Sequence, residues 1–226
     1  MLYEEVIAKL ETLADPVAVK GMARYGIAAK RAYGVSMPNL RLLAKEIGKN
    51  HGLADRLWQE DSRETRILAS LVDLPGMVSE EQAERWVMGF DSWEICDQCC
   101  ANLLDRTPFA YTKCFDWSAR GEEFVKRAGF VLMARLAVSD KRAPDEKFVA
   151  FLPVIAREAP DGRNFVKKAV NWALRQIGKR NLHLNHLALA TAREMQTLDS
   201  STARWIAADA IRELMSEPIQ RRLCSK

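Results

Sequence analysis

A tryptophan and an aspartate stand four residues apart in the stretch DSWEICDQCC, which spans residues 91–100. Apolar periodicity predicts a helix there, so Trp93 and Asp97 project from the same side of it. Asp97 falls at the edge of the apolar face and not on the far polar side. Two interpretations follow. The pair is either an interface tryptophan beside a surface acid, or a carboxylate and an aromatic ring placed to do chemistry.

The same stretch holds three cysteines, and Cys96 and Cys99 have the spacing of a metal or redox pair. A structural zinc site needs four ligands, and the sequence has no second pair of this kind. The three histidines are distant and have no matching spacing. A redox pair would begin a helix in a βαβ unit, and no strands are predicted. We therefore expect the cysteines to pack in the core, with no metal and no cofactor.

A second tryptophan, Trp172, lies on the basic side of a predicted helix and away from the centre of its apolar stripe. Lys168, Arg175 and Lys179 align with it at helical spacing. A large indole normally seeks the core. This tryptophan therefore either covers the end of a neighbouring helix, or contacts a ligand that carries phosphates and a flat or cationic group.

Basic residues are unevenly distributed along the chain, although the net charge is only +4. No acid lies between Asp15 and Glu46 or between Asp161 and Glu194, and these blocks hold six and seven lysines and arginines. Either block alone could be a solvated helix face. Two such blocks favour one continuous basic surface, while the acids concentrate around residues 73–105.

Apolar residues recur at three- and four-residue spacing along almost the whole chain, which predicts helices. They are expected at 3–13, 17–31, 38–48, 51–60, 62–74, 79–90, 93–106, 108–119, 122–139, 145–158, 162–179, 183–197 and 201–215. Short connections and a shared apolar rhythm indicate stacked antiparallel pairs. We predict an all-α fold: an α-solenoid of HEAT-like helix pairs with a concave basic groove, forming a single domain over residues 1–226.

Local signals refine these boundaries. Asp91 and Glu94 have the spacing of a capping box before the helix at 93–106, and Pro153 is expected to kink the helix at 145–158. The segment EFVKRAGFVLMARLAV is apolar almost all round, which predicts a buried helix. The tail EPIQRRLCSK is expected to be frayed.

The chain has no run of about 18 apolar residues, so no membrane span or membrane partner is expected. Its N-terminal stretch lacks the pattern of a secretory signal. We expect a cytoplasmic protein with reduced cysteines, acting as a monomer.

Three segments resemble the DNA alkylation repair family of AlkD-type HEAT-like-repeat glycosylases. SWEICD is similar to the family's Trp-x-x-x-Asp segment, and FVKRAGFVLMARLA to its arginine-bearing buried helix. FVKKAVNWALRQIGKRN closely resembles its Ile/Val-x-Lys-Ala-x-x-Trp-x-Leu-Arg segment and is the most specific of the three. The resemblance extends from about residue 20 to residue 215.

The resemblance implies an enzyme that hydrolyses the N-glycosidic bond of positively charged N3- or N7-alkylated purines in duplex DNA. Trp93, Asp97 and Trp172 match the family's catalytic-pocket positions, and Arg127 matches its arginine, with Arg135 as an alternative. The two basic blocks would contact DNA phosphates. The positions selected for this role are Lys168, Arg175, Lys179, Arg180, Lys30, Arg31 and Arg41.

These residue types suit that chemistry. A cationic purine is already a good leaving group, so the charge that needs stabilising is the oxocarbenium-like charge on the sugar. The Asp97 carboxylate could stabilise it and position water. Trp93 and Trp172 could wall the site, and Arg127 could hold a phosphate. Two alternatives stay open: a non-catalytic solenoid that binds nucleic acid or protein, and an enzyme for another nucleic-acid lesion.

Overall fold

The computed structural model describes residues 1–27 and 31–225, and every regular element within these ranges is a helix. The all-α prediction is therefore confirmed. The chain divides into two compact units, Met1–Phe109 and Ala110–Lys226, and each is described by itself. Within the described ranges, no helix is long and apolar enough to cross a membrane.

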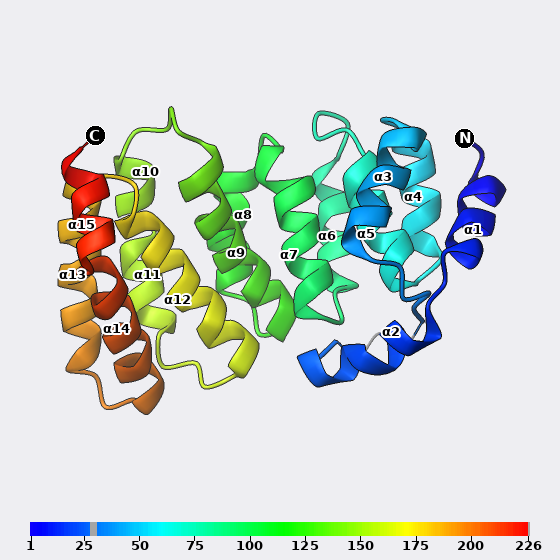
Figure 1. The fold of residues 1–226 in the computed structure, drawn as a ribbon. Coiled ribbons are helices and arrows are strands. Elements are labelled where there is room, and N and C mark those ends of the chain that lie inside the picture. The colour runs from blue at the N-terminus through cyan, green and yellow to red at the C-terminus, as the bar shows by residue number, and fades with distance from the viewer. Residues whose placement is uncertain (28–30, 226) are drawn as a thin grey trace. The chain divides into compact units, whose positions relative to one another are not determined.

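The first unit is a set of short helices around a central one (Figure 1). It contains α1 Tyr3–Thr12, α2 Pro16–Met22, the 3-10 helix η1 Ala23–Tyr25, α3 Met37–Ile47, α4 His51–Gln59, α5 Arg63–Val72, α6 Glu80–Met88, α7 Trp93–Asn102 and the 3-10 helix η2 Leu104–Arg106. The central helix is α5, which contacts α3, α4 and α7. Trp58 of α4 stacks on Trp86 of α6 with the ring centroids 4.3 Å apart, which joins these two helices.

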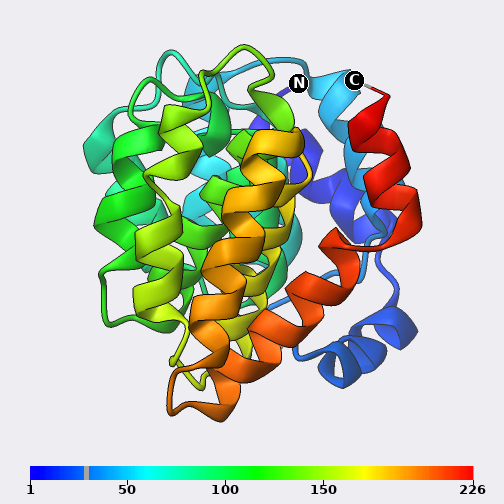
Figure 2. The ribbon, with the colours of Figure 1, turned by 90° about the vertical axis from the view of Figure 1, so that its left-hand side faces the viewer.

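The second unit continues the pattern of paired helices (Figures 1 and 2). It contains α8 Ala110–Ser118, α9 Glu123–Ser139, α10 Glu146–Val149, α11 Leu152–Glu158, α12 Asn164–Gly178, α13 Leu182–Gln196, α14 Ser201–Leu214 and α15 Glu217–Cys224. α9 contacts α8 and α12, and α12 contacts α13 and α14. Figure 2 shows α13 beside α11, and each helix has a fully buried side chain, Ile155 on α11 and Leu184 on α13.

α9 is buried along most of its length, as its sequence predicts. Gly129 permits its close packing on α8, because a Cβ atom at this position would lie 2.5 Å from the backbone nitrogen of Ser118. Any other residue would push the two helices apart.

Three of the predicted helical segments differ from the structure. The helix expected at 17–31 stops at Met22, and η1 after it ends at Gly26, whose φ of 70° suits glycine. Lys30 lies outside the described residues. The tail, expected to be frayed, contains α15, because Leu223 is buried and the Gln220 amide donates to the Leu214 carbonyl at 2.6 Å.

The segment expected as one kinked helix at 145–158 forms two helices, α10 and α11. Pro153 lies in the first turn of α11. Proline is well tolerated there, because the N–H groups of a first turn have no partner within the helix. The proline therefore marks the start of a helix and not a bend within one.

Candidate functional site

Trp93 and Asp97 lie one turn apart on α7, and both side chains are half-buried. The helix begins after Ser92, whose hydroxyl accepts from the Ile95 backbone N–H at 3.4 Å. The expected cap, Asp91, instead forms an ion pair with Arg66 at 3.5 Å. The local geometry agrees with the predicted pairing of the tryptophan and the carboxylate on one side of the helix.

A buried ion network fixes the first turn of α7. The Arg63 guanidinium donates to both Glu94 oxygens, from Nε at 2.7 Å and from Nη2 at 2.6 Å. It also donates to Glu64 at 2.8 Å. All three side chains are buried. Burial by itself lowers the pKa of Arg63, but the hydrogen bonds and charge of Glu94 and Glu64 raise it above its ordinary value.

The Glu64 carboxylate also secures the segment that precedes α3. It accepts backbone N–H bonds from Tyr33 and Gly34, each at 2.9 Å, and from Val35 at 3.2 Å. The network therefore joins α5 and residues 33–35 to the first turn of α7, the helix that carries Trp93 and Asp97. Sequence reasoning missed it. The available signal was the pair Arg63-Glu64 at the start of a helix with an otherwise apolar inner face.

The cysteines beside Asp97 belong to the core. Cys96, Cys99, Cys100 and Cys114 are free thiols with no exposed surface. Burial raises the pKa of the Cys99, Cys100 and Cys114 thiols well above the ordinary value, so they stay neutral. Their predicted packing role is confirmed. Among the described residues, no group of three or more histidines, cysteines and acids could hold a metal ion.

Arg127 and Trp172 lie in the second unit, on the neighbouring helices α9 and α12. Arg127 is 6% exposed and donates from Nη1 to the Phe165 carbonyl at 2.6 Å. Trp172 is half-buried. When the Gln176 side-chain amide is flipped, its oxygen accepts hydrogen bonds from Trp172 Nε1 at 2.9 Å and from Lys179 Nζ at 3.3 Å. Arg135, the alternative arginine, is half-buried further along α9.

The basic residues that the sequence aligns with Trp172 have different environments. Lys168 is exposed. Arg175 and Lys179 instead form ion pairs with Glu213 of α14, and the Lys179–Glu213 distance is 2.6 Å. Burial alone raises the pKa of Glu213, but the hydrogen bonds from the two cations hold it below its ordinary value. Part of the basic face therefore serves to join α12 to α14.

Arg180 organises the turn that follows α9. Its guanidinium donates to the carbonyls of Ala137 at 2.8 Å, Asp140 at 3.0 Å and Ala143 at 3.3 Å. It also lies 3.9 Å from the ring centroid of Phe148, within the range of a cation–π contact. The predicted DNA-binding residue thus has a clear structural role in this unit.

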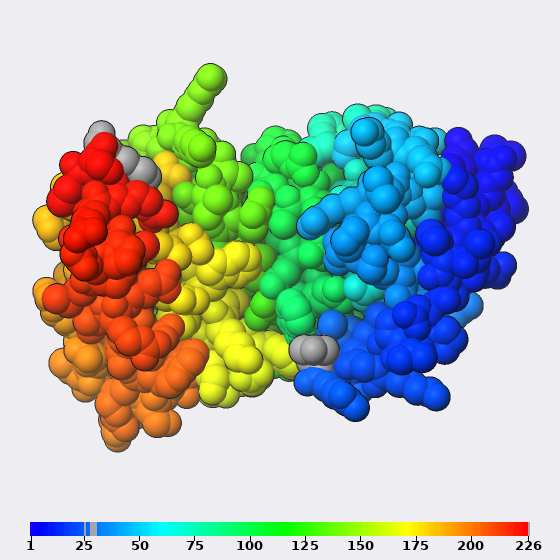
Figure 3. Space-filling model, in the orientation of Figure 1, coloured from blue at the N-terminus to red at the C-terminus, as the bar shows by residue number. Residues whose placement is uncertain are grey.

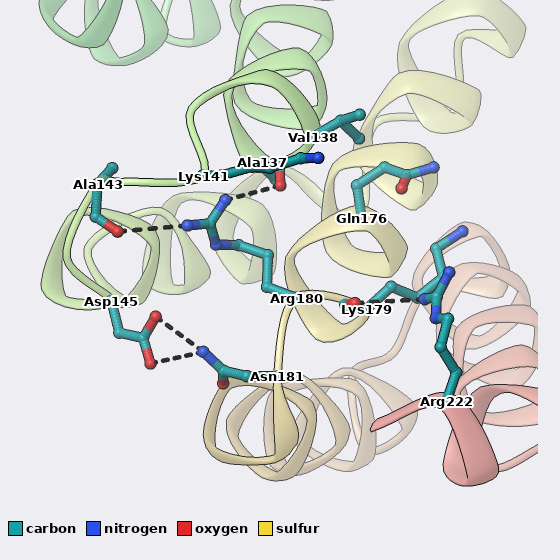
Figure 4. Close-up of a pocket in the computed structure, with 10 residues that line it drawn as sticks. All are labelled: Ala137, Val138, Lys141, Ala143, Asp145, Gln176, Lys179, Arg180, Asn181 and Arg222. Carbon is teal, nitrogen blue, oxygen red and sulfur yellow. Dashed lines mark hydrogen bonds between the residues drawn. The ribbon is translucent and has the colours of Figure 1, made fainter. Parts of the chain in front are cut away.

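A basic cleft of about 560 Å³ opens beside these residues in the second unit (Figure 4). Its cations are Lys141, Lys179, Arg180 and Arg222. The one acid in its lining, Asp145, accepts from the Asn181 amide at 2.9 and 3.0 Å. Lys141 and Arg222 were not selected from the sequence. Arg222 belongs to the tail and donates to the Lys179 carbonyl at 3.3 Å.

The first unit has a second basic cleft, of about 340 Å³, lined by Arg41, Lys45 and Lys49. Lys49 donates to the carbonyls of Leu71 and Asp73, each at 2.8 Å. Burial, and then the charge of Arg106, lower the pKa of Lys49. Arg31, selected from the sequence, is exposed and pairs with Glu60 at 3.2 Å.

Comparisons with known proteins agree with the helical architecture. A solved structure matches over 95% of this chain and 96% of its own, with a TM-score of 0.78 and 20% sequence identity. It is described as representing a new family of proteins related to the HEAT-like repeat DNA glycosylases with affinity for branched DNA structures. At this identity the match shows the fold, so the helix pairs are HEAT-like repeats. No curated protein sequence matches the chain.

A family model described as DNA alkylation repair enzyme matches residues 6–214. This span includes α7, α9 and α12, the three helices that carry the candidate residues. The chain therefore belongs to the DNA alkylation repair enzyme family.

Proposed function

We propose that this protein is a DNA glycosylase of base excision repair, which releases positively charged N3- or N7-alkylated purines from duplex DNA. The observation that carries the proposal is the position of Asp97. Its carboxylate is half-buried, one turn after Trp93, on a helix whose first turn is held by the pair of Arg63 and Glu94. A fixed, partly dry carboxylate stabilises developing positive charge better than a mobile, solvated one.

The proposed reaction breaks the bond between the sugar C1′ and the alkylated purine. The bonding electrons leave with the cationic purine, which becomes neutral and needs no strong acid. Positive charge then develops on the sugar, where Asp97 stabilises it and orients the attacking water, which loses a proton as the new C–O bond forms. Trp93 and Trp172 would attract the cationic base and pack on the sugar.

DNA phosphates are assigned to the basic residues. Arg127 would hold a phosphate near the lesion. Lys168 is exposed, and the clefts of the two units add further cations, including Lys141 and Arg41. Contacts of this type are independent of sequence and weaken with salt.

The decisive experiment is base release from methylated duplex DNA. Wild-type protein should release 7-methylguanine or 3-methyladenine. Asp97→Asn should lower the rate by about 100-fold or more and still bind DNA. Asp55→Asn replaces a partly exposed acid of α4 in the same unit and should act like wild type. Absence of release by the wild-type protein would refute the enzymatic proposal.

Trp172 lies in the other unit from Asp97, so a shared role needs its own test. Trp172→Ala and the double variant with Asp97→Asn complete a double-mutant cycle of the release rate. Residues that act in one step lose much less together than the sum of the single losses. Additive losses would assign Trp172 to DNA binding outside the reacting site.

A second candidate function is binding of branched DNA without base release. It is favoured by the two basic clefts, which do not depend on Asp97, and by the affinity for branched DNA described for the protein of similar fold. Binding of a four-way junction much tighter than that of a linear duplex, with no release from methylated DNA, would support it.

A further inference from the structure

Trp205 is a large aromatic side chain that the fold leaves 44% exposed. α14 buries Ala203, Ile206, Ala207, Ala210 and Leu214 against the rest of the second unit. Trp205 is off this stripe. Tryptophan has one of the largest apolar surfaces of any side chain, and leaving it in water forfeits the free energy of burial. Its exposure at this position therefore needs an explanation.

The surroundings of Trp205 are basic. Lys167 of α12 places its ammonium 5.3 Å from the ring centroid, and Lys168 beside it is exposed. On α14, Arg204 and Arg212 are exposed. We call these five residues, Lys167, Lys168, Arg204, Trp205 and Arg212, the α14 patch. In Figure 3 the side chains of α12 and α14 lie next to each other on one face of this unit.

The acids near the α14 patch offset only part of its charge. Asp209 accepts from the Asn171 amide at 2.7 Å and pairs with Arg212. Asp199 is fully exposed and lies 3.7 Å from Arg204. Both lysines on α12 lie outside these pairs. The α14 patch therefore combines a partly accessible indole with net positive charge.

We propose that the α14 patch binds an unpaired nucleotide of a DNA strand. The base stacks on Trp205, and flanking phosphates contact Lys167, Lys168 and Arg212. This combination of an aromatic platform and cations is the one that binds single strands without sequence preference. In an intact duplex the base faces are covered by neighbouring bases, so the proposal selects unpaired or extruded nucleotides.

Charge and shape disfavour a protein partner at this position. The next residue along the exposed side of α14 is Ala208, followed by Arg212, so the indole is not part of a wide apolar stripe. Stable protein interfaces have an apolar, charge-depleted centre. The α14 patch has the opposite distribution, with a single ring among cations.

The proposal rests on the DNA binding assumed above, but its test is independent of base release. Binding of a labelled oligothymidylate and of a blunt, unmodified duplex is measured by fluorescence anisotropy at one salt concentration. Trp205→Ala should weaken oligothymidylate binding by about 5- to 160-fold, the range for loss of one stacked base. It should change duplex binding much less. Trp205→Phe, which keeps a ring, should retain most of the affinity.

Phe115→Ala is the matched control, because Phe115 is an aromatic residue of the same unit with 40% exposure, and its removal should leave oligothymidylate binding unchanged. Equal binding by Trp205→Ala and wild type overturns the proposal. So does an equal loss on both DNA forms, which would indicate a general effect on the unit. A change in oligomeric state without a change in DNA affinity assigns the patch to a second copy of the chain and also overturns it.

Discussion

Arg63→Met should be among the most destabilising substitutions in the first unit. Arg63 is 6% exposed and bridges Glu64 and Glu94, which are 0% and 8% exposed. The methionine fills much of the same volume but removes the only cation that the structure places on this acid pair within the described residues. Two carboxylates then stay buried with one unit of positive charge removed.

The expected cost follows from the asymmetry of buried ion pairs. Breaking such a pair by deleting one partner costs about 3–5 kcal/mol, because the other partner keeps its desolvation penalty. Glu64 retains three backbone N–H donors, so most of the penalty falls on Glu94. Glu94→Gln should be milder, about 1.5–3 kcal/mol for a lost charged hydrogen bond, since Arg63 and Glu64 still balance each other.

Urea unfolding followed by tryptophan fluorescence measures these free energies. Arg56→Met is the matched control, since its guanidinium is exposed and its pair with Glu4 lies in solvent, where ion pairs contribute little. The double variant Arg63→Met with Glu94→Gln should regain part of the loss. A cost of Arg63→Met no larger than that of Arg56→Met would refute the reasoning, as would a larger cost for Glu94→Gln than for Arg63→Met.

Two further predictions concern residues of the second unit, and the first of them uses a glycine of the first unit as its control. Gly129→Ala should destabilise the protein by about 1–3 kcal/mol, because its Cβ would lie 2.5 Å from the Ser118 backbone nitrogen. Gly21→Ala in α2 is the control: a Cβ there has open space, so this variant should be neutral or stabilising. Thermal unfolding of the two variants and the wild type measures the difference. Hydrogen bonds from Arg163 hold the pKa of Asp161 below its ordinary value of 3.8. The contribution of ionised Asp161 to the free energy of unfolding is therefore fully present above pH 3.8. It is lost as the pH falls through the lower pKa that Asp161 has in the folded protein. Urea midpoints of wild type and Asp161→Asn should differ at neutral pH and converge in acid; a constant difference would contradict this.

Helix positions could be predicted from the sequence because apolar spacing reports which face is buried. α9 illustrates this, since a segment apolar on all sides has to be surrounded by other helices. The errors arose where one residue outweighs the pattern. Gly26 ends the 3-10 helix η1 through its left-handed conformation. The tail is ordered into α15 by one buried leucine, Leu223, and by hydrogen bonds from Gln220 and Arg222 to the preceding helices. Periodicity does not detect either effect.

The candidate site was only partly predictable, for a different reason. The spacing of Trp93 and Asp97 on one helix is a local property and could be predicted. The buried network that holds that helix joins residues about 30 positions apart, and the charged pair that begins α5 looks like an ordinary helix start. Whether a charged residue lies on the surface or forms a buried ion pair with another helix depends on what that neighbouring helix carries, and no local sequence pattern describes this.

The same dependence limits what a run of basic residues can predict. The acid-free block after Asp161 suggests a uniform basic surface, yet Glu213, some 35 residues beyond the middle of that block, binds both Arg175 and Lys179. Solenoid folds make this common, because each helix packs against the equivalent helix of the next repeat. A basic run can therefore form a nucleic-acid surface only at positions that the next repeat leaves without acids, and we propose this role for Lys168 and for the cleft residues Arg41 and Lys45.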